Sequence, residues 1–211
     1  MKRLSPSRRV PLALATAFRS ALLRLLALTC PRKQVRGFEV VDLGASGSLE
    51  FFTRKVSDAL QLIETHDPPR FARIRRDMKR FALIPGGGEF YHHGLNAYVM
   101  DVGSAQTRSV SELAATIVHE ATHARLMRAG FFPTEAEKEE VERICTEAEA
   151  SFAEKLPDAP GLAEKARAKL STRWWTAEAM RSRRMEQFRA SGMPKWLLGL
   201  FAKFVLRRPD P

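Results

Sequence analysis

The amino-acid sequence predicts an α+β fold in which a small mixed or antiparallel sheet accompanies two long antiparallel helices. Apolar residues recur at helical spacing in several segments, whereas residues 37–43 and 81–102 carry the shorter, β-branched pattern of strands. One helix that ends near Gly130 is separated by only a few residues from another long helix. So short a link favours antiparallel packing of the two helices.

The distribution of charge divides the chain into three regions. The 211 residues have a net charge of +11, but residues 1–36 contain nine Lys or Arg and no acid, and residues 181–208 contain eight Lys or Arg and one acid. The body between these ends is therefore mildly acidic, unlike a uniformly basic nucleic-acid binder. We expect a basic amphipathic segment over residues 1–36, one folded domain over 37–192, a basic amphipathic tail over 193–211, and no nucleic-acid partner.

Both ends have the composition of membrane-surface segments. The apolar run over residues 10–30 contains Arg19 and Arg24, which are costly in a spanning helix and foreign to a secretory signal. The run therefore predicts an amphipathic helix on an anionic membrane surface, and the alternative is a helix packed on the protein's own body. Residues 195–208 are apolar, aromatic at their start and basic at their end, and too short to span a bilayer.

Cysteine usage indicates the compartment. Cys30 and Cys145 lie far apart in unlike surroundings, which argues against a disulfide scaffold and fits a reducing environment. We therefore expect a cytoplasmic protein that is peripheral on the inner face of the membrane.

The remaining elements follow from periodicity and from residues that break helices and strands. The arginine-rich helix among them is expected to present a solvated face rather than a phosphate site. In order, we expect a strand over 37–43, a loop over 44–47, a helix from Ser48 to the break at Pro68-Pro69, a helix over 70–80, a short strand over 81–84, a turn at 86–88, and one or two strands within 89–102.

The most informative stretch is His119-Glu120-Ala121-Thr122-His123. Ser109 and Glu112 form a capping box that begins its helix, and Gly130 ends it. Residues four apart share one face of a helix, so both histidines can bind one metal ion, and they lie opposite the apolar stripe. Glu120 can reach a water on that metal. The alternative is two surface histidines that stand four apart by chance, but this spacing is typical of zinc-dependent hydrolases.

A third zinc ligand is expected on the following helix, because no histidine follows His123. That helix begins at Thr134, is capped with Glu137, and runs to about residue 156; a further helix covers about 162–191. If the turn is centred near residue 132, the histidines face positions 141–145. We expect Glu142 to be the third ligand. Glu149 is the alternative ligand, or a carboxylate that supports a ligand. Cys145 lies at the same level and is expected to pack in the core.

The H-E-x-x-H motif with a downstream helical glutamate resembles the gluzincin branch of zinc metallopeptidases, and residues 118–156 look like bacterial proteins of that kind. The resemblance implies a zincin-like fold for residues 37–192 and one Zn²⁺ ion. It implies His119 and His123 as ligands, Glu120 as the base and Glu142 as the third ligand. Many gluzincins steady the oxyanion with a downstream His or Tyr, which this chain lacks. The remaining candidates are Tyr91, His92, His93, Tyr98 or an arginine.

The expected function is therefore zinc-dependent hydrolysis of a peptide or protein, with a zinc-activated water and Glu120 as general base. A strand that precedes the H-E-x-x-H helix could pair with an extended peptide through its free edge. The alternative is a non-catalytic, zinc-stabilised, membrane-associated adaptor. Glu120 separates the two hypotheses, because a purely structural zinc site has no use for it.

Overall fold

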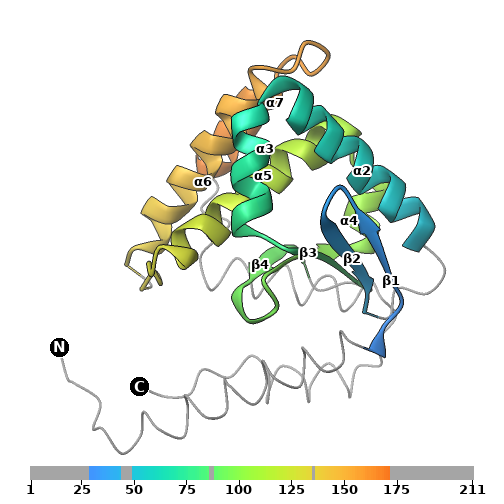
Figure 1. The fold of residues 1–211 in the computed structure, drawn as a ribbon. Helices are drawn as coiled ribbons and strands as arrows, with labels where there is room; N and C mark the ends of the chain where they lie inside the picture. The colour runs from blue at the N-terminus through green and yellow to red at the C-terminus, as the bar shows by residue number, and fades with distance from the viewer. Residues whose placement is uncertain (1–28, 44–48, 86–87, 135, 172–211) are drawn as a thin grey trace, which may run out of the picture.

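The structure, a computed structural model, describes residues 29–43, 49–85, 88–134 and 136–171. Within these ranges the predicted α+β class is confirmed, with a five-stranded mixed sheet and six α-helices (Figure 1). The elements are β1 (Arg32–Val35), β2 (Phe38–Asp42), α2 (Leu49–His66), α3 (Pro68–Asp77), β3 (Arg80–Ile84), β4 (Phe90–His92), the 3₁₀ turn η1 (His93–Leu95), β5 (Ala97–Asp101), α4 (Val102–Thr107), α5 (Val110–Arg128), α6 (Lys138–Ala153) and α7 (Leu162–Ser171).

The sheet has the strand order β1-β2-β3-β5-β4. The three inner strands β2, β3 and β5 are parallel, whereas β1 and β4 are antiparallel to their neighbours. Among the described strands β4 pairs with β5 alone, so it forms one edge of the sheet. That edge lies beside α5, which carries the H-E-x-x-H motif.

The helices α2, α3 and α5 cover one face of the sheet (Figure 1). Alternate strand residues point into this core, as the two-residue period of a strand requires. The opposite face also carries a small buried apolar cluster, to which no α-helix of the described ranges contributes. Its buried members are Val41, Ala82, Leu95, Ala97 and Val99.

The hairpin of β1 and β2 was not predicted, because residues 32–36 were assigned to the N-terminal segment. The turn residues Arg36 and Gly37 both have positive φ, at 48° and 85°, which is the conformation of a type I′ turn. β1 is mostly exposed and polar, so its sequence lacks the apolar alternation of a strand. The sheet therefore begins at Arg32, five residues before the predicted boundary.

The helix α3 begins at Pro68 rather than at residue 70. Its N-cap is Asp67, whose side chain accepts a hydrogen bond from the backbone N–H of Arg70. The two prolines that were predicted to break the chain occupy the first turn, where no intrahelical N–H is needed. The helix ends at Asp77, and Arg80 begins β3 instead of ending the helix.

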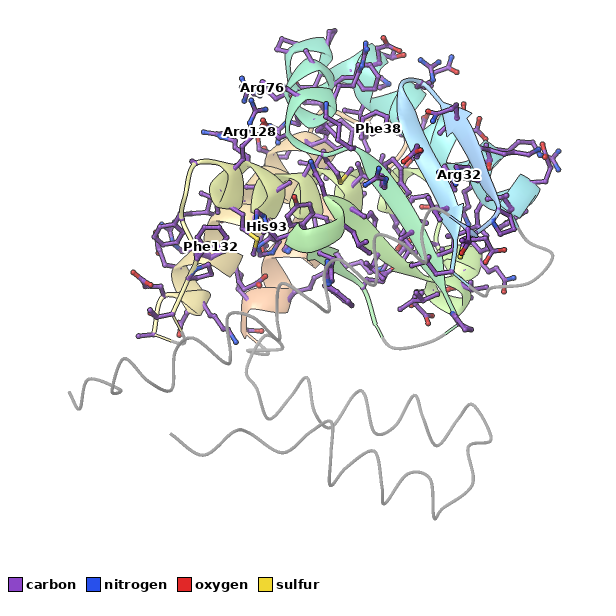
Figure 2. The ribbon with its side chains drawn as sticks, turned by 60° about the horizontal axis from the view of Figure 1, so that its bottom comes forward. Arg32, Phe38, Arg76, His93, Arg128 and Phe132 are labelled. Atoms are coloured by element: carbon purple, nitrogen blue, oxygen red, sulfur yellow. The ribbon has the colours of Figure 1, made fainter. Side chains whose placement is uncertain are left out.

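The expected solvated face of this helix is exposed as predicted and also contributes to packing. Arg76 and Arg128, which are 57% and 55% exposed, pair with Asp77, which is only 3% exposed (Figure 2). The distances to Asp77 Oδ1 are 2.8 Å from Arg76 Nε and 2.9 Å from Arg128 Nη1. These contacts hold the end of α3 against the end of α5.

Two further helix boundaries differ from expectation. The short helix α4 was not predicted; it begins at Val102, the last residue of the predicted strands, where the side chain of Asp101 accepts from the N–H of Ser104 and caps it. The helix α6 begins at Lys138 rather than directly after Thr134. Glu137 nevertheless reaches back, and its Oε2 accepts from the backbone N of Thr134 at 2.8 Å.

Of the predicted membrane-surface helix over residues 10–30, positions 10–28 lie outside the described residues. The predicted tail over 193–211 also lies outside them. The helix predicted over 162–191 is described only as far as Ser171. Among the described helices none has the length and apolarity needed to cross a bilayer. Cys30 and Cys145 are both free thiols.

Asp67 gives a testable stability prediction. Its carboxylate, 5% exposed, pairs with Arg70 and Lys155, each at 2.8 Å. Burial alone would raise the pKa of this carboxyl, but Lys155 and Arg70 outweigh burial and lower it below the ordinary 3.8. Asp67→Asn should therefore reduce the free energy of unfolding by about 1–2 kcal/mol at pH 7. The stabilisation by the Asp67 carboxylate is complete above the ordinary pKa of 3.8 and is lost as the pH falls through the lowered pKa of the folded protein.

Urea unfolding of the wild type and Asp67→Asn between pH 7 and pH 2 measures this difference. Asp58→Asn, which changes an exposed aspartate on α2, is the control and should behave as the wild type. If the wild type and Asp67→Asn still differ by the same free energy of unfolding at pH 2, the carboxylate charge is not the source of the difference.

Candidate metal centre

The helix α5 places the motif between two layers of the fold. Its predicted capping box is present, since Glu112 N–H donates to Ser109 Oγ at 3.1 Å and Ser109 N–H donates to Glu112 Oε2 at 3.0 Å. The apolar stripe packs on the sheet, and α6 lies beside the opposite side. As a result His119 and Glu120 are only 4% and 5% exposed. The two histidines therefore belong to a helix interface and not to the surface.

Three polar side chains converge at this interface. His119 Nε2 lies 3.3 Å from His123 Nε2, and a Glu142 oxygen lies 3.3 Å from the first nitrogen and the other 3.5 Å from the second. Glu142 thus stands at the level of α6 where the sequence predicted a third ligand. The packing of α6 beside α5 brings it there, and His119 also contacts Glu149, about two turns further along α6.

Cys145 completes the set of potential donors. Its thiol is fully buried, and its sulfur lies within 4.8 Å of the ligand nitrogens of His119 and His123. The chain therefore contains a buried His-His-Cys group that could bind a metal ion, with the carboxylate of Glu142 alongside. Burial, and then the charges of Glu142, Glu120 and Glu149, raise the pKa of the thiol. These carboxylates oppose the thiolate form in the metal-free chain.

Glu149 lies on the other side of the His119 ring. Its Oε2 is 3.1 Å from His119 Nδ1, whereas Glu142 approaches Nε2. A carboxylate at Nδ1 favours the tautomer that carries its proton there, which leaves a lone pair on Nε2. Glu149 therefore stands where a carboxylate orients a metal-binding histidine, and Glu142 stands where a ligand would.

Proton sharing dominates the electrostatics of the metal-free group. Burial alone would lower the pKa of His119, but hydrogen bonds with Glu142 and Glu149 outweigh it and raise the pKa to about 10. Burial alone would raise the pKa of Glu142, but His119 and His123 outweigh it and lower the pKa to about 2. A metal ion at this position must therefore compete with a proton on His119.

Among the described residues, three carboxylate oxygens in this region are buried without a hydrogen bond of ordinary geometry: Oε2 of Glu120, Oε1 of Glu89 and Oε2 of Glu142, the last of which has only its 3.3 Å contact with His119 Nε2. A buried polar atom without a partner is rare and calls for a ligand, a water or a catalytic role. Glu120 and Glu142 are residues of the predicted site, and Glu89 interacts electrostatically with Glu120. These oxygens are the observation that best distinguishes this group from an ordinary buried ion-pair network.

A second polar cluster borders Glu120. Glu89 pairs with Arg108, and Arg108 Nη1 lies 3.4 Å from the hydroxyl of Tyr98. Burial first, and then the charges of Glu89 and Glu120, raise the pKa of Tyr98. Burial also raises the pKa of Glu89, against the pull of Arg108 and with a further rise from Glu120. Of the proposed oxyanion candidates, Tyr98 and an arginine are thus the two in the electrostatic surroundings of Glu120.

The other three candidates are engaged elsewhere. The hydroxyl of Tyr91 donates to Asn96 Oδ1 at 3.0 Å, and His92 Nδ1 accepts from the N–H of Leu95 at 3.1 Å. The ring of His93 packs edge-on against Phe132 in the α5–α6 link, with the ring centroids 5.2 Å apart (Figure 2).

Glu89 and Lys169 were not predicted as neighbours of the site, and Arg108 was predicted only as an unspecified arginine. Lys169 on α7 pairs with Glu149 at 2.6 Å. None of the three belongs to a motif with a fixed spacing from His119. Only the packing of β4, α4 and α7 around α5 and α6 brings them close.

These elements define an α+β domain with a candidate metal centre between two antiparallel helices. Comparison of the chain with protein-family models, with curated proteins and with solved structures gives no match. The function is therefore inferred from the geometry and chemistry of the site.

Proposed function

We propose that the chain is a zinc-dependent metallopeptidase of the gluzincin type, with a zincin-like fold. The observation that carries the proposal is the convergence of His119 Nε2, His123 Nε2 and the Glu142 carboxylate next to Glu120. The buried Oε2 of Glu120 has no hydrogen-bond partner in the described part of the chain. Two imidazoles and a carboxylate are a common protein ligand set for catalytic zinc, with the fourth position left open.

The spacing of the donor atoms supports zinc. Ligand atoms bound about 2.0–2.1 Å from zinc in a tetrahedron lie about 3.3–3.4 Å from one another. Here the two nitrogens lie 3.3 Å apart, Glu142 Oε2 lies 3.3 Å from His119 Nε2, and Glu142 Oε1 lies 3.5 Å from His123 Nε2. The residues present therefore place two nitrogens and a carboxylate at about the spacing of zinc ligands.

The proposed chemistry assigns a separate task to each residue. His119, His123 and Glu142 would hold the ion, which when bound supplies Lewis acidity and lowers the pKa of a water molecule. Glu120 accepts the proton of the attacking water through Oε2 and passes it to the leaving amine. Glu149 keeps the His119 ring in place. Arg108, which pairs with Glu89 near Glu120, could steady negative charge on the peptide carbonyl oxygen.

The proposed substrate is an extended peptide or a protein segment. β4 is an edge strand that pairs with β5 alone among the described strands, and it lies beside α5. A strand edge next to the candidate centre can hold a substrate backbone by strand addition. This arrangement supports cleavage of peptide bonds over hydrolysis of a small ester.

A second candidate function is a non-catalytic, zinc-stabilised, membrane-associated adaptor, and Cys145 is the observation that favours it. Its sulfur lies within reach of both histidines, so a Cys145 thiolate could close the fourth position. A closed site is typical of structural zinc. The cobalt-substituted protein distinguishes the two, because a thiolate ligand gives an intense near-ultraviolet charge-transfer band that Cys145→Ser would abolish.

Zinc analysis of the purified full-length protein tests the proposal. We expect about one zinc per chain in the wild type and none in the double variant His119→Ala/His123→Ala, together with zinc-dependent cleavage of a denatured protein substrate by the wild type. Stoichiometric zinc in the double variant would refute the assigned site. Zinc without cleavage, together with the thiolate band, would support the adaptor.

The two glutamates on α6 should differ in their effect on zinc affinity. Loss of a carboxylate that orients a ligand typically costs 10–100-fold in affinity, so loss of the ligand itself should cost at least as much. We therefore expect Glu142→Ala to weaken zinc binding more than Glu149→Ala does, as measured by competition with a chromophoric chelator. The reverse ranking would assign the third ligand to Glu149.

A further inference from the structure

The helix α7 carries none of the candidate ligands, yet one of its side chains reaches the candidate metal centre. Lys169 Nζ lies 2.6 Å from Glu149 Oε1, and Glu149 Oε2 lies 3.1 Å from His119 Nδ1. The two oxygens of one carboxylate thus connect a cation on α7 to a histidine on α5.

Glu149 is the most deeply buried acid of the site, at 2% exposure. A buried carboxylate is costly unless it is paired and hydrogen-bonded, and a neutral imidazole supplies only one N–H. The ammonium group of Lys169 supplies the opposite charge and fixes the second oxygen. With both oxygens held, the carboxylate has one orientation, and the ring of His119 is aligned with it.

The packing of α7 on α6 determines where Lys169 lies. Small residues line this interface, which lets the two helix backbones approach closely; they are Ala150 and Ala153 on α6 and Ala163 and Ala166 on α7. Arg167 on α7 also pairs with Glu147 on α6, whereas the pair of Lys165 with Glu112 on α5 is exposed and contributes little to the packing. The stem of Lys169, whose side chain is 43% exposed, then places its ammonium group at Glu149.

We propose that Lys169 is a positioning residue of the metal centre. It holds the Glu149 carboxylate, which keeps the His119 ring turned so that Nε2 faces His123 and Glu142. The inference rests on the proposed metal site, and it makes α7 a part of that site. An outer carboxylate matters by about 10–100-fold in metal affinity. Lys169 acts one step further out, so we expect its removal to cost about tenfold.

The test compares full-length wild type, Lys169→Met and Lys169→Arg, with Lys165→Met as the matched control. Lys165 lies on the same helix and pairs with Glu112, in the first turn of α5 and about two turns before His119. Zn²⁺ affinity is measured by chelator competition, and the visible absorption of the Co²⁺-loaded protein reports ligand geometry. Lys169→Met should lose about tenfold in Zn²⁺ affinity and change the Co²⁺ spectrum. Lys169→Arg should restore most of both, and Lys165→Met should match the wild type.

The possible results are distinguishable. A wild type that binds no Zn²⁺ overturns the proposed function and this inference together. A wild type that binds Zn²⁺, with Lys169→Met equal to it in affinity and spectrum, overturns the inference alone, as does an equal loss in Lys165→Met. If Lys169→Met does not fold, Glu149→Gln removes the same ion pair from the other side. It should reproduce the loss of affinity, and an unchanged affinity would overturn the inference.

Discussion

Replacement of Glu120 by Gln is expected to keep about one zinc per chain and to lower the rate of peptide hydrolysis by about 10²–10⁴-fold. The amide has nearly the shape of the carboxylate, so the packing of α5 should not change. It cannot accept a proton from water, however, and Glu120 is placed as the base and not as a ligand. Its Oε2 is one of the side-chain oxygens that are buried without a hydrogen-bond partner among the described residues.

Glu147→Gln is the control for this experiment, because it makes the same chemical change on α6 at a residue that pairs with Arg167. It should retain both zinc and activity. If Glu120→Gln cleaves the substrate as fast as the wild type, another group accepts the proton. Loss of zinc in this variant would instead show that Glu120 is a ligand.

The parts of the site that could be predicted from the sequence are those set by local spacing. His119 and His123 share a helix face because they are four residues apart, and the short link to α6 determines the level at which Glu142 meets them. A helix period and a turn length are sufficient for that estimate. The observed separations of 3.3 and 3.5 Å between Glu142 and the two histidines agree with it.

The parts that could not be predicted depend on contacts distant in sequence or on backbone conformations without a strong signal. β1 is a polar strand that depends on a turn in which Arg36 adopts positive φ, a rare choice for a residue other than Gly, Asn or Asp. Lys169 reaches Glu149 across 20 residues. Glu89 and Arg108 meet Tyr98 only after β4 and α4 have packed.

Removal of zinc is expected to lower the midpoint of thermal unfolding, and to lower it more at pH 8 than at pH 6. The reason is the proton on His119 in the metal-free protein. Its pKa is raised from 6.5 to about 10 by Glu142 and Glu149, against the effect of burial. The stability that this protonated histidine contributes is therefore complete below pH 6.5 and is lost as pH rises towards 10. Zinc requires the unprotonated nitrogen, so its advantage grows over the same range.

The size of the effect follows from mass action. Zinc at about 1,000 times its dissociation constant stabilises the folded state by about 4 kcal/mol, or about 8–16 °C for a domain of this size. Thermal unfolding at pH 6, 7 and 8, with zinc and with a chelator, measures the difference. The double variant His119→Ala/His123→Ala should unfold at one temperature under both conditions. A zinc-induced shift that is the same at all three pH values would show that zinc does not displace a proton from His119.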